Sequence, residues 1–203
     1  MTGHPVDVSV IIPVYEDPDG IRRTLEAVTR QTAPASAYEV VVVDNGSADA
    51  TPAVVSQFVS EHPDLMTLTV EDEIQGSYAA RNAGIRAAAG EILAFVDADM
   101  TVDRSWVAAV RETMADGEHS YVGFDVEIVP TDPESAVAAY NRQTEFPVAQ
   151  YVANDDFAPT CCLAVRREVV EAVGLFDDRM LSSGDAECGR RVAEAGFDQH
   201  YEP

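Results

Sequence analysis

The feature that most constrains this 203-residue chain is the alternation of short apolar runs with amphipathic stretches in its first half. The apolar runs, which are rich in β-branched residues and predict buried strands, are 8–13, 38–43, 65–70 and 92–96. Helical spacing of apolar residues predicts helices at about 20–30, 50–60, 77–89 and 106–115. This pattern is typical of an α/β fold with a mostly parallel central sheet flanked by helices.

The second half is less regular. It predicts strands at 121–129, 160–165 and 197–203, and helices at 166–173 and 186–195. We interpret 131–156 as a helix plus a loop over the site, and we expect Asp103 to cap the helix at 106–115. The length suits a single domain.

The composition is strongly acidic. The formal net charge is −23, from 36 acidic against 13 basic residues, and every basic residue is an arginine. Such a surface argues against binding nucleic acid or an anionic membrane through a basic patch. The acid excess without lysine resembles proteins of salt-rich cytoplasms, with simple compositional drift as the alternative.

The sequence favours a cytoplasmic protein. No apolar run approaches the roughly 18 residues that span a membrane, and no secretory signal is expected at the N-terminus. The three cysteines, Cys161, Cys162 and Cys188, have the spacing of neither a zinc site nor a disulfide framework.

Polar side chains follow three of the predicted strands. Tyr15 and Glu16 follow the first, Asp44 the second, and Asp97 and Asp99 the fourth. In open α/β sheets ligands gather at the carboxyl ends of the strands, so these residues are expected to converge. Two carboxylates at i and i+2 suit a divalent cation, which can neutralise a diphosphate. The alternative is a pair of exposed acids in a very acidic protein.

Other nucleotide-binding patterns are absent. There is no lysine for a Walker loop and no GxGxxG turn, so charge neutralisation falls to a metal and to arginine. Arg81, near the start of a predicted helix, is the candidate, unless it is a surface residue. Asp44 can accept from a base N–H, form an Asx-turn, or do both. Tyr15 can cover a base or ribose, or lie at the rim of the core.

A further carboxylate, Asp185, opens a helix after a Ser-Gly turn. It is either an N-cap or a general base. Glu187 either orients an acceptor or only solvates the surface.

Four blocks together resemble glycosyltransferase family 2, which has the GT-A fold: VSVIIPVYE, VVVDNGS, ARNAGIRAAAGEILAFVDADM and LAVRREVVEAVGLFDDRMLSSGDAECGRRVAEAGF. The resemblance extends in order from Val8 to about Phe197. It implies a UDP- or GDP-linked sugar donor, Mn²⁺ or Mg²⁺, and inversion at the anomeric carbon. It also implies one GT-A domain over 1–203, with donor binding in 1–117 and the acceptor and base in 118–203.

The resemblance assigns roles to individual residues. The donor would be bound by Pro13, Tyr15, Glu16, Asp44, Asn45, Gly76, Arg81, Asp97 and Ala98. Asp97-Ala98-Asp99 is similar to the DxD motif, with Asp99 as the direct metal ligand and Asp97 nearer the ribose or metal waters. Asp185 matches the base, with Gly184 and Glu187 beside the acceptor. In this mechanism Asp185 deprotonates the acceptor hydroxyl, while the metal and Arg81 stabilise the leaving nucleoside diphosphate.

The sequence departs from the family pattern in three places. Asn45 stands where a second acid is frequent, and Gly184 stands where glutamate often precedes the base. Members usually continue beyond the position of Pro203, so we expect a truncated chain. The sequence does not decide whether the acceptor is a glycan, a lipid-linked molecule or a protein. It also leaves open whether the chain forms a homodimer and whether it lies at the cytoplasmic face of a membrane. The alternative functions are a nucleotidyltransferase and a nucleotide-sugar-binding module without turnover.

Overall fold

The computed structural model describes residues 6–115, 117–129 and 146–203. In chain order these residues form β1 (Val8–Val14), α1 (Pro18–Val28), β2 (Tyr38–Asp44), α2 (Thr51–Glu61), β3 (Met66–Val70), α3 (Ser77–Ala87), β4 (Ile92–Phe95), α4 (Trp106–Thr113), β5 (Tyr121–Phe124), α6 (Val148–Asp155), β6 (Leu163–Arg166), α7 (Arg167–Val173), α8 (Gly184–Glu194) and β7 (Gln199–Glu202).

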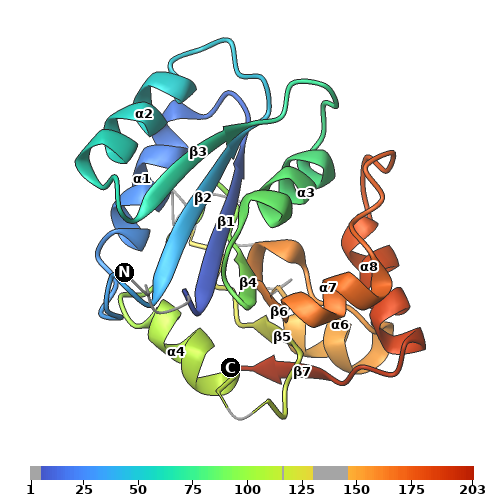
Figure 1. The fold of residues 1–203 in the computed structure, drawn as a ribbon. Coiled ribbons are helices and arrows are strands. Elements are labelled where there is room, and N and C mark those ends of the chain that lie inside the picture. The colour runs from blue at the N-terminus through green and yellow to red at the C-terminus, as the bar shows by residue number, and fades with distance from the viewer. Residues whose placement is uncertain (1–5, 116, 130–145) are drawn as a thin grey trace.

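The strands form one sheet with the order β3-β2-β1-β4-β6-β5-β7 (Figure 1). The pairs β1–β2, β1–β4, β2–β3 and β5–β7 are parallel. Strand β6 is antiparallel to both of its neighbours, β4 and β5. The prediction of a mostly parallel sheet flanked by helices is therefore confirmed, and the sheet continues from the first half of the chain into the second.

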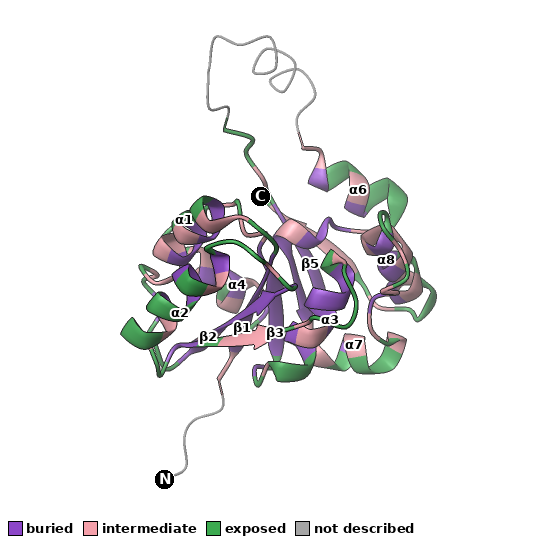
Figure 2. Cartoon of the chain, turned by 90° about the horizontal axis from the view of Figure 1, so that it is seen from above, coloured by how far each residue is buried: buried purple, intermediate pink, exposed green. Residues whose placement is uncertain are grey.

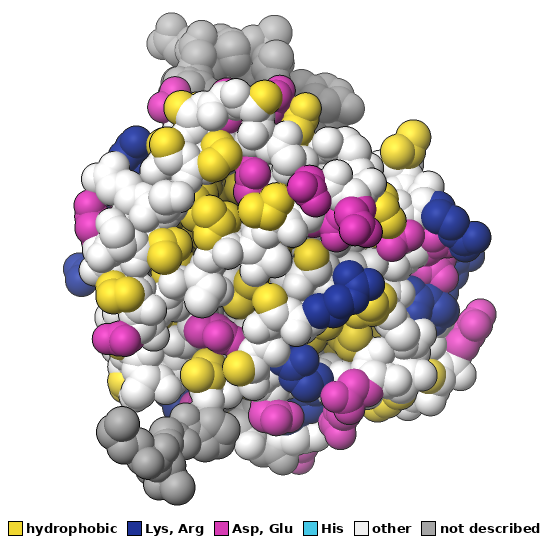
Figure 3. Space-filling model, turned by 45° about the horizontal axis from the view of Figure 1, so that its top comes forward, with side chains coloured by type: hydrophobic (Ala, Val, Ile, Leu, Met, Phe, Trp, Pro, Cys, Tyr) yellow, Lys and Arg dark blue, Asp and Glu magenta, His cyan; other side chains and the backbone are white. Residues whose placement is uncertain are grey.

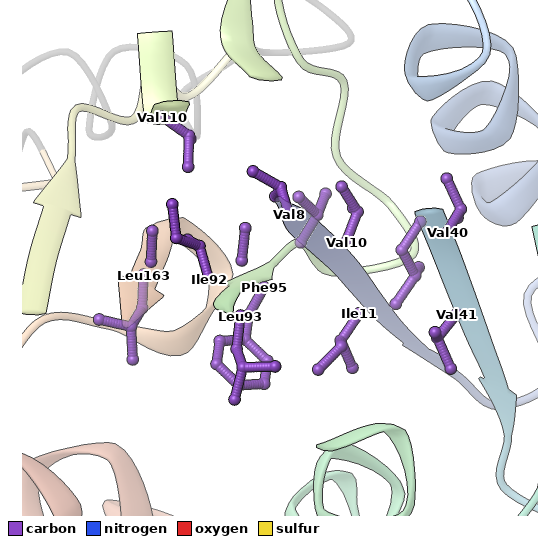
Figure 4. Packing of buried hydrophobic residues seen from close by; sticks show 14 of the residues in the cluster. Val8, Val10, Ile11, Val40, Val41, Ile92, Leu93, Phe95, Val110 and Leu163 are labelled. Atoms are coloured by element: carbon purple, nitrogen blue, oxygen red, sulfur yellow. The ribbon is translucent and has the colours of Figure 1, made fainter. Parts of the chain in front are cut away.

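Helices cover both faces of this sheet. Seen from above, α1, α2 and α4 lie on one side of the buried strands, and α3, α7 and α8 lie on the other (Figure 2). Every residue of β1 is buried, because β1 has strands on both sides and helices on both faces. Successive side chains of a strand point to opposite faces, as Figure 4 shows for Val8, Val10, Ile11, Val40, Val41, Ile92 and Leu93.

The structure corrects several predicted boundaries. Strand β5 was predicted to reach residue 129 but ends at Phe124, which is also the last residue that pairs with β7. Residues Thr160–Cys162 form a 3₁₀ turn, and β6 begins only at Leu163. Of the predicted helix and loop at 131–156, residues 131–145 lie outside the described part, and Val148–Asp155 is helical.

The expected cap at Asp103 is also corrected. The Asp103 Oδ1 atom accepts from the backbone N and the Oγ of Ser105, at 2.8 and 2.6 Å. Helix α4 begins at Trp106, after Ser105 as N-cap, and has no side-chain cap hydrogen bond. The Asp103 carboxylate thus closes a turn ahead of the helix, because Ser105 supplies both of the donors that it accepts from.

No helix within the described ranges is long and apolar enough to cross a membrane.

The charge of the chain predicts that salt stabilises this fold. With a net charge of −23, the compact state carries strong self-repulsion, which mobile ions screen. We expect the thermal midpoint to rise between about 0.1 M and 1 M KCl, by at least the 2–4 °C that roughly 1 kcal/mol represents in a chain of this size. Thermal unfolding followed by circular dichroism measures it, and an unchanged or falling midpoint would contradict the prediction.

Candidate active site

A cavity of about 340 Å³ opens at the carboxyl ends of β1, β2 and β4, beside the start of α3. It is lined by Pro13, Val14, Tyr15, Asn45, Gln75, Gly76, Ser77, Ala80, Arg81 and Asp97. The parallel register brings the strand ends together, since Val14 pairs with Asp44 and Ile11 with Phe95. Figure 3 looks onto the upper part of the molecule, where hydrophobic, acidic and arginine side chains lie interspersed.

The structure brings six of the residues predicted to bind the donor or its metal into the wall of this cavity: Pro13, Tyr15, Asn45, Gly76, Arg81 and Asp97. The remaining four, Glu16, Asp44, Ala98 and Asp99, are near neighbours of wall residues in the chain but do not line it. Sequence reasoning did not single out Val14, Gln75, Ser77 and Ala80, whose uncharged side chains carry no chemical signal of their own.

The end of β1 presents an aromatic ring to solvent. The Tyr15 residue is 49% exposed although it belongs to the cavity wall. The next residue, Glu16, has a φ of 47°, and its N–H donates to Ser47 Oγ at 2.9 Å. A half-exposed aromatic ring held by a fixed turn can pack against a flat ligand.

Asp44 is almost completely buried, at 4% exposure. Its Oδ2 accepts from the Ser47 N–H at 3.3 Å, which gives the expected turn. Its Oδ1 is buried and has no hydrogen-bond partner within the described residues. An unpartnered buried carboxylate oxygen is costly, and a ligand N–H that reached this atom would relieve the cost.

Asn45 holds the loop at 71–76 in place. Its Oδ1 accepts from the Gly76 N–H at 2.7 Å and from the Gln75 side chain at 3.2 Å. Its Nδ2 donates to the carbonyl oxygens of Glu71 and Ile74 at 2.7 and 2.9 Å. These four bonds use the whole hydrogen-bonding capacity of an amide. An aspartate at this position would have no N–H to donate to either carbonyl.

Gly76 is the N-cap residue of α3, with φ 155° and ψ 145°, a conformation that is nearly exclusive to glycine. A Cβ there would meet no atom within 4 Å, so substitution acts through the backbone alone. We expect Gly76→Ala to lower the free energy of unfolding by about 1–3 kcal/mol and to weaken nucleotide binding, because the cavity wall shifts. Urea unfolding and nucleotide-induced thermal shifts measure the two effects.

Gly196→Ala is the matched control for this prediction. Gly196 also has a positive φ, 85°, and a Cβ there would likewise meet no atom within 4 Å. It follows α8 and lies outside the cavity. This control should lose stability but keep the nucleotide-induced shift. Equal nucleotide-induced shifts in the wild type and Gly76→Ala would contradict the role assigned to Gly76.

Arg81 is buried rather than on the surface. Its side chain is 6% exposed, and Nη2 donates to Asp97 Oδ1 at 2.5 Å. The guanidinium carbon lies 5.7 Å from the centre of the Tyr78 ring. This ion pair partly compensates the charge of Arg81, while Arg81 also lines the cavity and its Nε has no hydrogen-bond partner among the described residues. Its role toward the leaving diphosphate stays a prediction.

Asp99 differs from Asp97 in being exposed, and its side chain makes no ion pair or hydrogen bond with any part of the chain that the structure describes. A turn fixes its backbone, because the Met100 N–H donates to the Asp97 carbonyl at 3.2 Å. Buried Thr24 supports this turn from α1, with Oγ1 at 2.7 Å from the Ala98 carbonyl and 2.6 Å from the Met100 carbonyl. Its one proton serves one carbonyl at a time. The sequence carried no signal for Thr24.

These carboxylates fit a Mg²⁺ or Mn²⁺ ion that also takes phosphate ligands. The described residues contain no group of three or more His, Cys, Asp and Glu side chains arranged to hold a metal. Mg²⁺ is usually bound by one or two carboxylates together with substrate phosphates, so a full protein cage is not required. Exposed Asp99 supplies hard, unpaired oxygen ligands of this kind.

Asp185 lies in the first turn of α8 and not at its N-cap, which is Ser183 with a φ of 61°. It is partly exposed, and its Oδ1 accepts from the Ala186 N–H at 3.0 Å. Burial and the nearby charge of Asp185 raise the pKa of Tyr78 above its ordinary value. The N–H of the preceding residue, Gly184, donates to Tyr78 Oη at 2.8 Å, so Asp185 lies beside α3, whose first turns line the cavity.

The two residues predicted beside the acceptor make internal contacts. Gly184 is buried, and its N–H donates to Tyr78 Oη at 2.8 Å. Both carboxylate oxygens of Glu187 accept from Arg191, at 2.8 and 2.9 Å. These contacts give Gly184 and Glu187 structural roles, and their place beside the acceptor stays a prediction.

Residues 9–174 match the family model described as glycosyl transferase family 2. This chain belongs to glycosyl transferase family 2.

Curated relatives and solved structures agree with this family assignment. Glycosyltransferase AglE of Haloferax volcanii is 41% identical over 190 residues, which cover 94% of this chain and 62% of the relative. The pre-mycofactocin glycosyltransferase of Mycobacterium tuberculosis is 30% identical over 97% of this chain and 41% of its own length. This family 2 chain thus spans about two to three fifths of these relatives.

Two solved structures share the fold. The mannosyltransferase PcManGT from Pyrobaculum calidifontis, in complex with GDP-Man and Mn²⁺, gives a TM-score of 0.77 at 27% identity, covering 100% of this chain and 57% of that one. The S. aureus TarS 1–349 structure with UDP-GlcNAc gives 0.75 at 19% identity, covering 97% and 56%. The second likeness shows the fold alone. Both are consistent with the predicted GT-A architecture.

Proposed function

We propose that this family 2 member is a metal-dependent, inverting glycosyltransferase that moves a sugar from a nucleoside-diphosphate sugar to an acceptor hydroxyl. One observation carries the proposal. Predicted donor residues from the ends of β1 and β4, from the turn after β2 and from α3 line one cavity at the carboxyl edge of the sheet. The 27%-identical mannosyltransferase in complex with GDP-Man and Mn²⁺ supports it.

The nucleotide is bound at the β1 and β2 ends of the cavity. The exposed Tyr15 ring packs against the base, and the free Oδ1 of Asp44 accepts from a base N–H. Uracil and guanine both offer such an N–H, so the donor is UDP- or GDP-linked. The start of α3 has no side-chain cap, and its N–H groups and positive dipole end favour the diphosphate.

Asp99, with Asp97, would hold Mn²⁺ or Mg²⁺. When bound, the cation neutralises charge that builds on the leaving diphosphate. Arg81, which lines the cavity, would stabilise the same charge, and its guanidinium also fixes the Asp97 carboxylate in one orientation. Thr24 keeps the backbone of the acidic turn in place.

Asp185 is the general base. It is partly exposed at the start of α8, so an acceptor hydroxyl can reach it. Its carboxylate takes the hydroxyl proton as the acceptor oxygen bonds to the anomeric carbon and the bond to the diphosphate breaks. Attack from the face opposite the leaving group inverts the configuration.

A two-part experiment tests the proposal. The first part is a thermal-shift panel of UDP- and GDP-sugars, with and without Mn²⁺ or Mg²⁺, in molar KCl; we expect stabilisation only when nucleotide and metal are both present. The second part measures products with glycan, lipid-linked and protein acceptors. Nucleoside diphosphate with an inverted glycoside supports the proposal. Pyrophosphate would indicate a nucleotidyltransferase, and binding without any release would indicate a binding module; either would contradict it.

The acceptor class, the homodimer, the salt-adapted origin and the location in the cytoplasm or at its membrane face stay predictions.

A further inference from the structure

Three residues on one face of α3 connect the donor side of the site to the base side. Tyr78, Arg81 and Asn82 have the i, i+3 and i+4 spacing of helix neighbours. Arg81 pairs with Asp97 after β4, whereas Tyr78 contacts Gly184 at the start of α8. Figure 1 shows α3 between the sheet and α8. The helix therefore joins the acidic turn to the segment that carries Asp185.

The contact between Tyr78 and Gly184 is close and specific. The Gly184 N–H donates to Tyr78 Oη at 2.8 Å, and the two residues are 106 positions apart in the chain. A Cβ on Gly184 would lie 2.7 Å from both Cε2 and Cζ of the ring. Because a ring packed on both sides cannot move aside easily, Gly184 has to be a glycine while Tyr78 is present.

The Tyr78 ring is itself firmly held. It stacks on Phe176 with 5.8 Å between ring centres, and Phe176 meets Phe95 of β4 edge-on at 5.8 Å. The Asn82 side chain fixes the backbone of Phe176, donating to its carbonyl at 2.9 Å and accepting from its N–H at 3.0 Å. The phenol oxygen thus has one position relative to β4 and the acidic turn that follows it.

The phenol is not the base. Tyr78 is 7% exposed, and burial together with the charge of Asp185 raises its pKa above 10.0. It therefore stays protonated and neutral at and around neutral pH.

We propose that Tyr78 is a positioning residue that holds Gly184 and thereby sets Asp185 at a fixed place relative to the Asp97–Arg81 pair. The inference rests on the proposed function, because it treats Asp185 as the base. It also accounts for Gly184 where the family resemblance leads one to expect glutamate, since the Tyr78 ring fills the space of a side chain. Displacement of a base by about 1 Å can cost up to roughly a hundredfold in rate, so such an anchor affects turnover.

The test is Tyr78→Phe in the full chain. The ring and its packing remain, and only the acceptor for the Gly184 N–H is lost. We expect kcat to fall about tenfold, with KM for the donor and the donor-induced thermal shift unchanged within about twofold. Amide exchange at Gly184, followed by NMR, is expected to speed up about tenfold, because its hydrogen bond is gone.

Tyr38→Phe is the matched control. Tyr38 is 3% exposed, and its Oη donates to the Val28 carbonyl at 2.9 Å, on the α1 side and outside the cavity. The Tyr38→Phe variant also loses one buried hydrogen bond of a tyrosine hydroxyl. It should therefore be less stable than the wild type but keep the wild-type kcat. A second variant, Gly184→Ala, should lower kcat without raising donor KM, because its methyl group displaces the Asp185 segment from the ring.

Three results would overturn the inference: kcat within twofold of wild type in Tyr78→Phe, equal kcat losses in Tyr78→Phe and Tyr38→Phe, or unchanged exchange at Gly184. A wild-type chain that transfers no sugar would instead overturn the proposed function. In that case exchange at Gly184 still decides whether Tyr78 anchors the segment, and the two failures remain distinguishable.

Discussion

Replacement of Asp185 by asparagine is expected to lower kcat by about 10²- to 10⁴-fold while leaving donor binding unchanged. Asparagine keeps the side-chain oxygen that accepts from the Ala186 N–H, so α8 should begin as before. It cannot accept the proton from an acceptor hydroxyl, and the attacking oxygen is then a far weaker nucleophile. Steady-state transfer kinetics and donor-induced thermal shifts measure the two quantities separately.

Glu194→Gln is the control for this change. Glu194 is exposed in the last turn of the same helix and makes no ion pair with a described residue, so the variant alters the net charge equally. It should retain wild-type kcat. If Asp185→Asn turns over about as fast as the control, Asp185 is not the general base. This conclusion holds whether or not donor binding changes.

Asp99→Ala is expected to abolish the metal-dependent part of the donor-induced thermal shift and to reduce turnover by about 10²-fold or more. A bound metal ion stabilises the charge of the transition state by several kcal/mol, and each 1.36 kcal/mol changes the rate about tenfold. The free energy of unfolding should stay within about 0.5 kcal/mol of wild type, because Asp99 is exposed and unpaired. Asp97 is the poorer target, since its loss leaves Arg81 buried without its carboxylate partner.

Asp64→Ala serves as the matched acidic control. Asp64 is exposed and lies between α2 and β3, away from the residues that line the cavity. It should behave as wild type in both assays. An Mn²⁺-dependent shift of wild-type size in Asp99→Ala would show that the cation is held elsewhere.

The sequence was sufficient to predict the first four strands and the edge at which they end. Buried parallel strands are continuous apolar runs, and the residue that follows each one must lie at the carboxyl edge. Tyr15 and Asp97, which line the cavity, could therefore be grouped with Asp44 before any contact was known. Their own chemistry, an aromatic ring or a polar group directly after an apolar run, distinguished them.

The rest of the sheet and the contacts inside the site depend on residues that are far apart in the sequence. Local sequence patterns do not encode such contacts. Strand β6 enters the sheet antiparallel between β4 and β5, a pairing that no periodicity predicts. The length of β5 depends on where β6 and β7 stop, not on its own residues. In the site, the resemblance assigned Asn45 to the donor, and no local pattern showed that its amide also holds the loop before α3.

The same limit applies to Tyr78 and Thr24. Tyr78 looks like an ordinary residue of an amphipathic helix until Gly184, 106 residues later, is found against its hydroxyl. Thr24 is likewise an ordinary residue of α1 whose carbonyl contacts follow β4. Both contacts join segments that only the folded chain brings together.

The most direct test of the central claim is a crystal structure of the protein with Mn²⁺ and a UDP- or GDP-sugar. We predict that the cation binds at Asp99 and Asp97, with the base at Tyr15 and Asp44 and the diphosphate at the start of α3. A cation bound at another place, or a donor that leaves Tyr15, Asp44 and Asp99 without contact, would contradict the account.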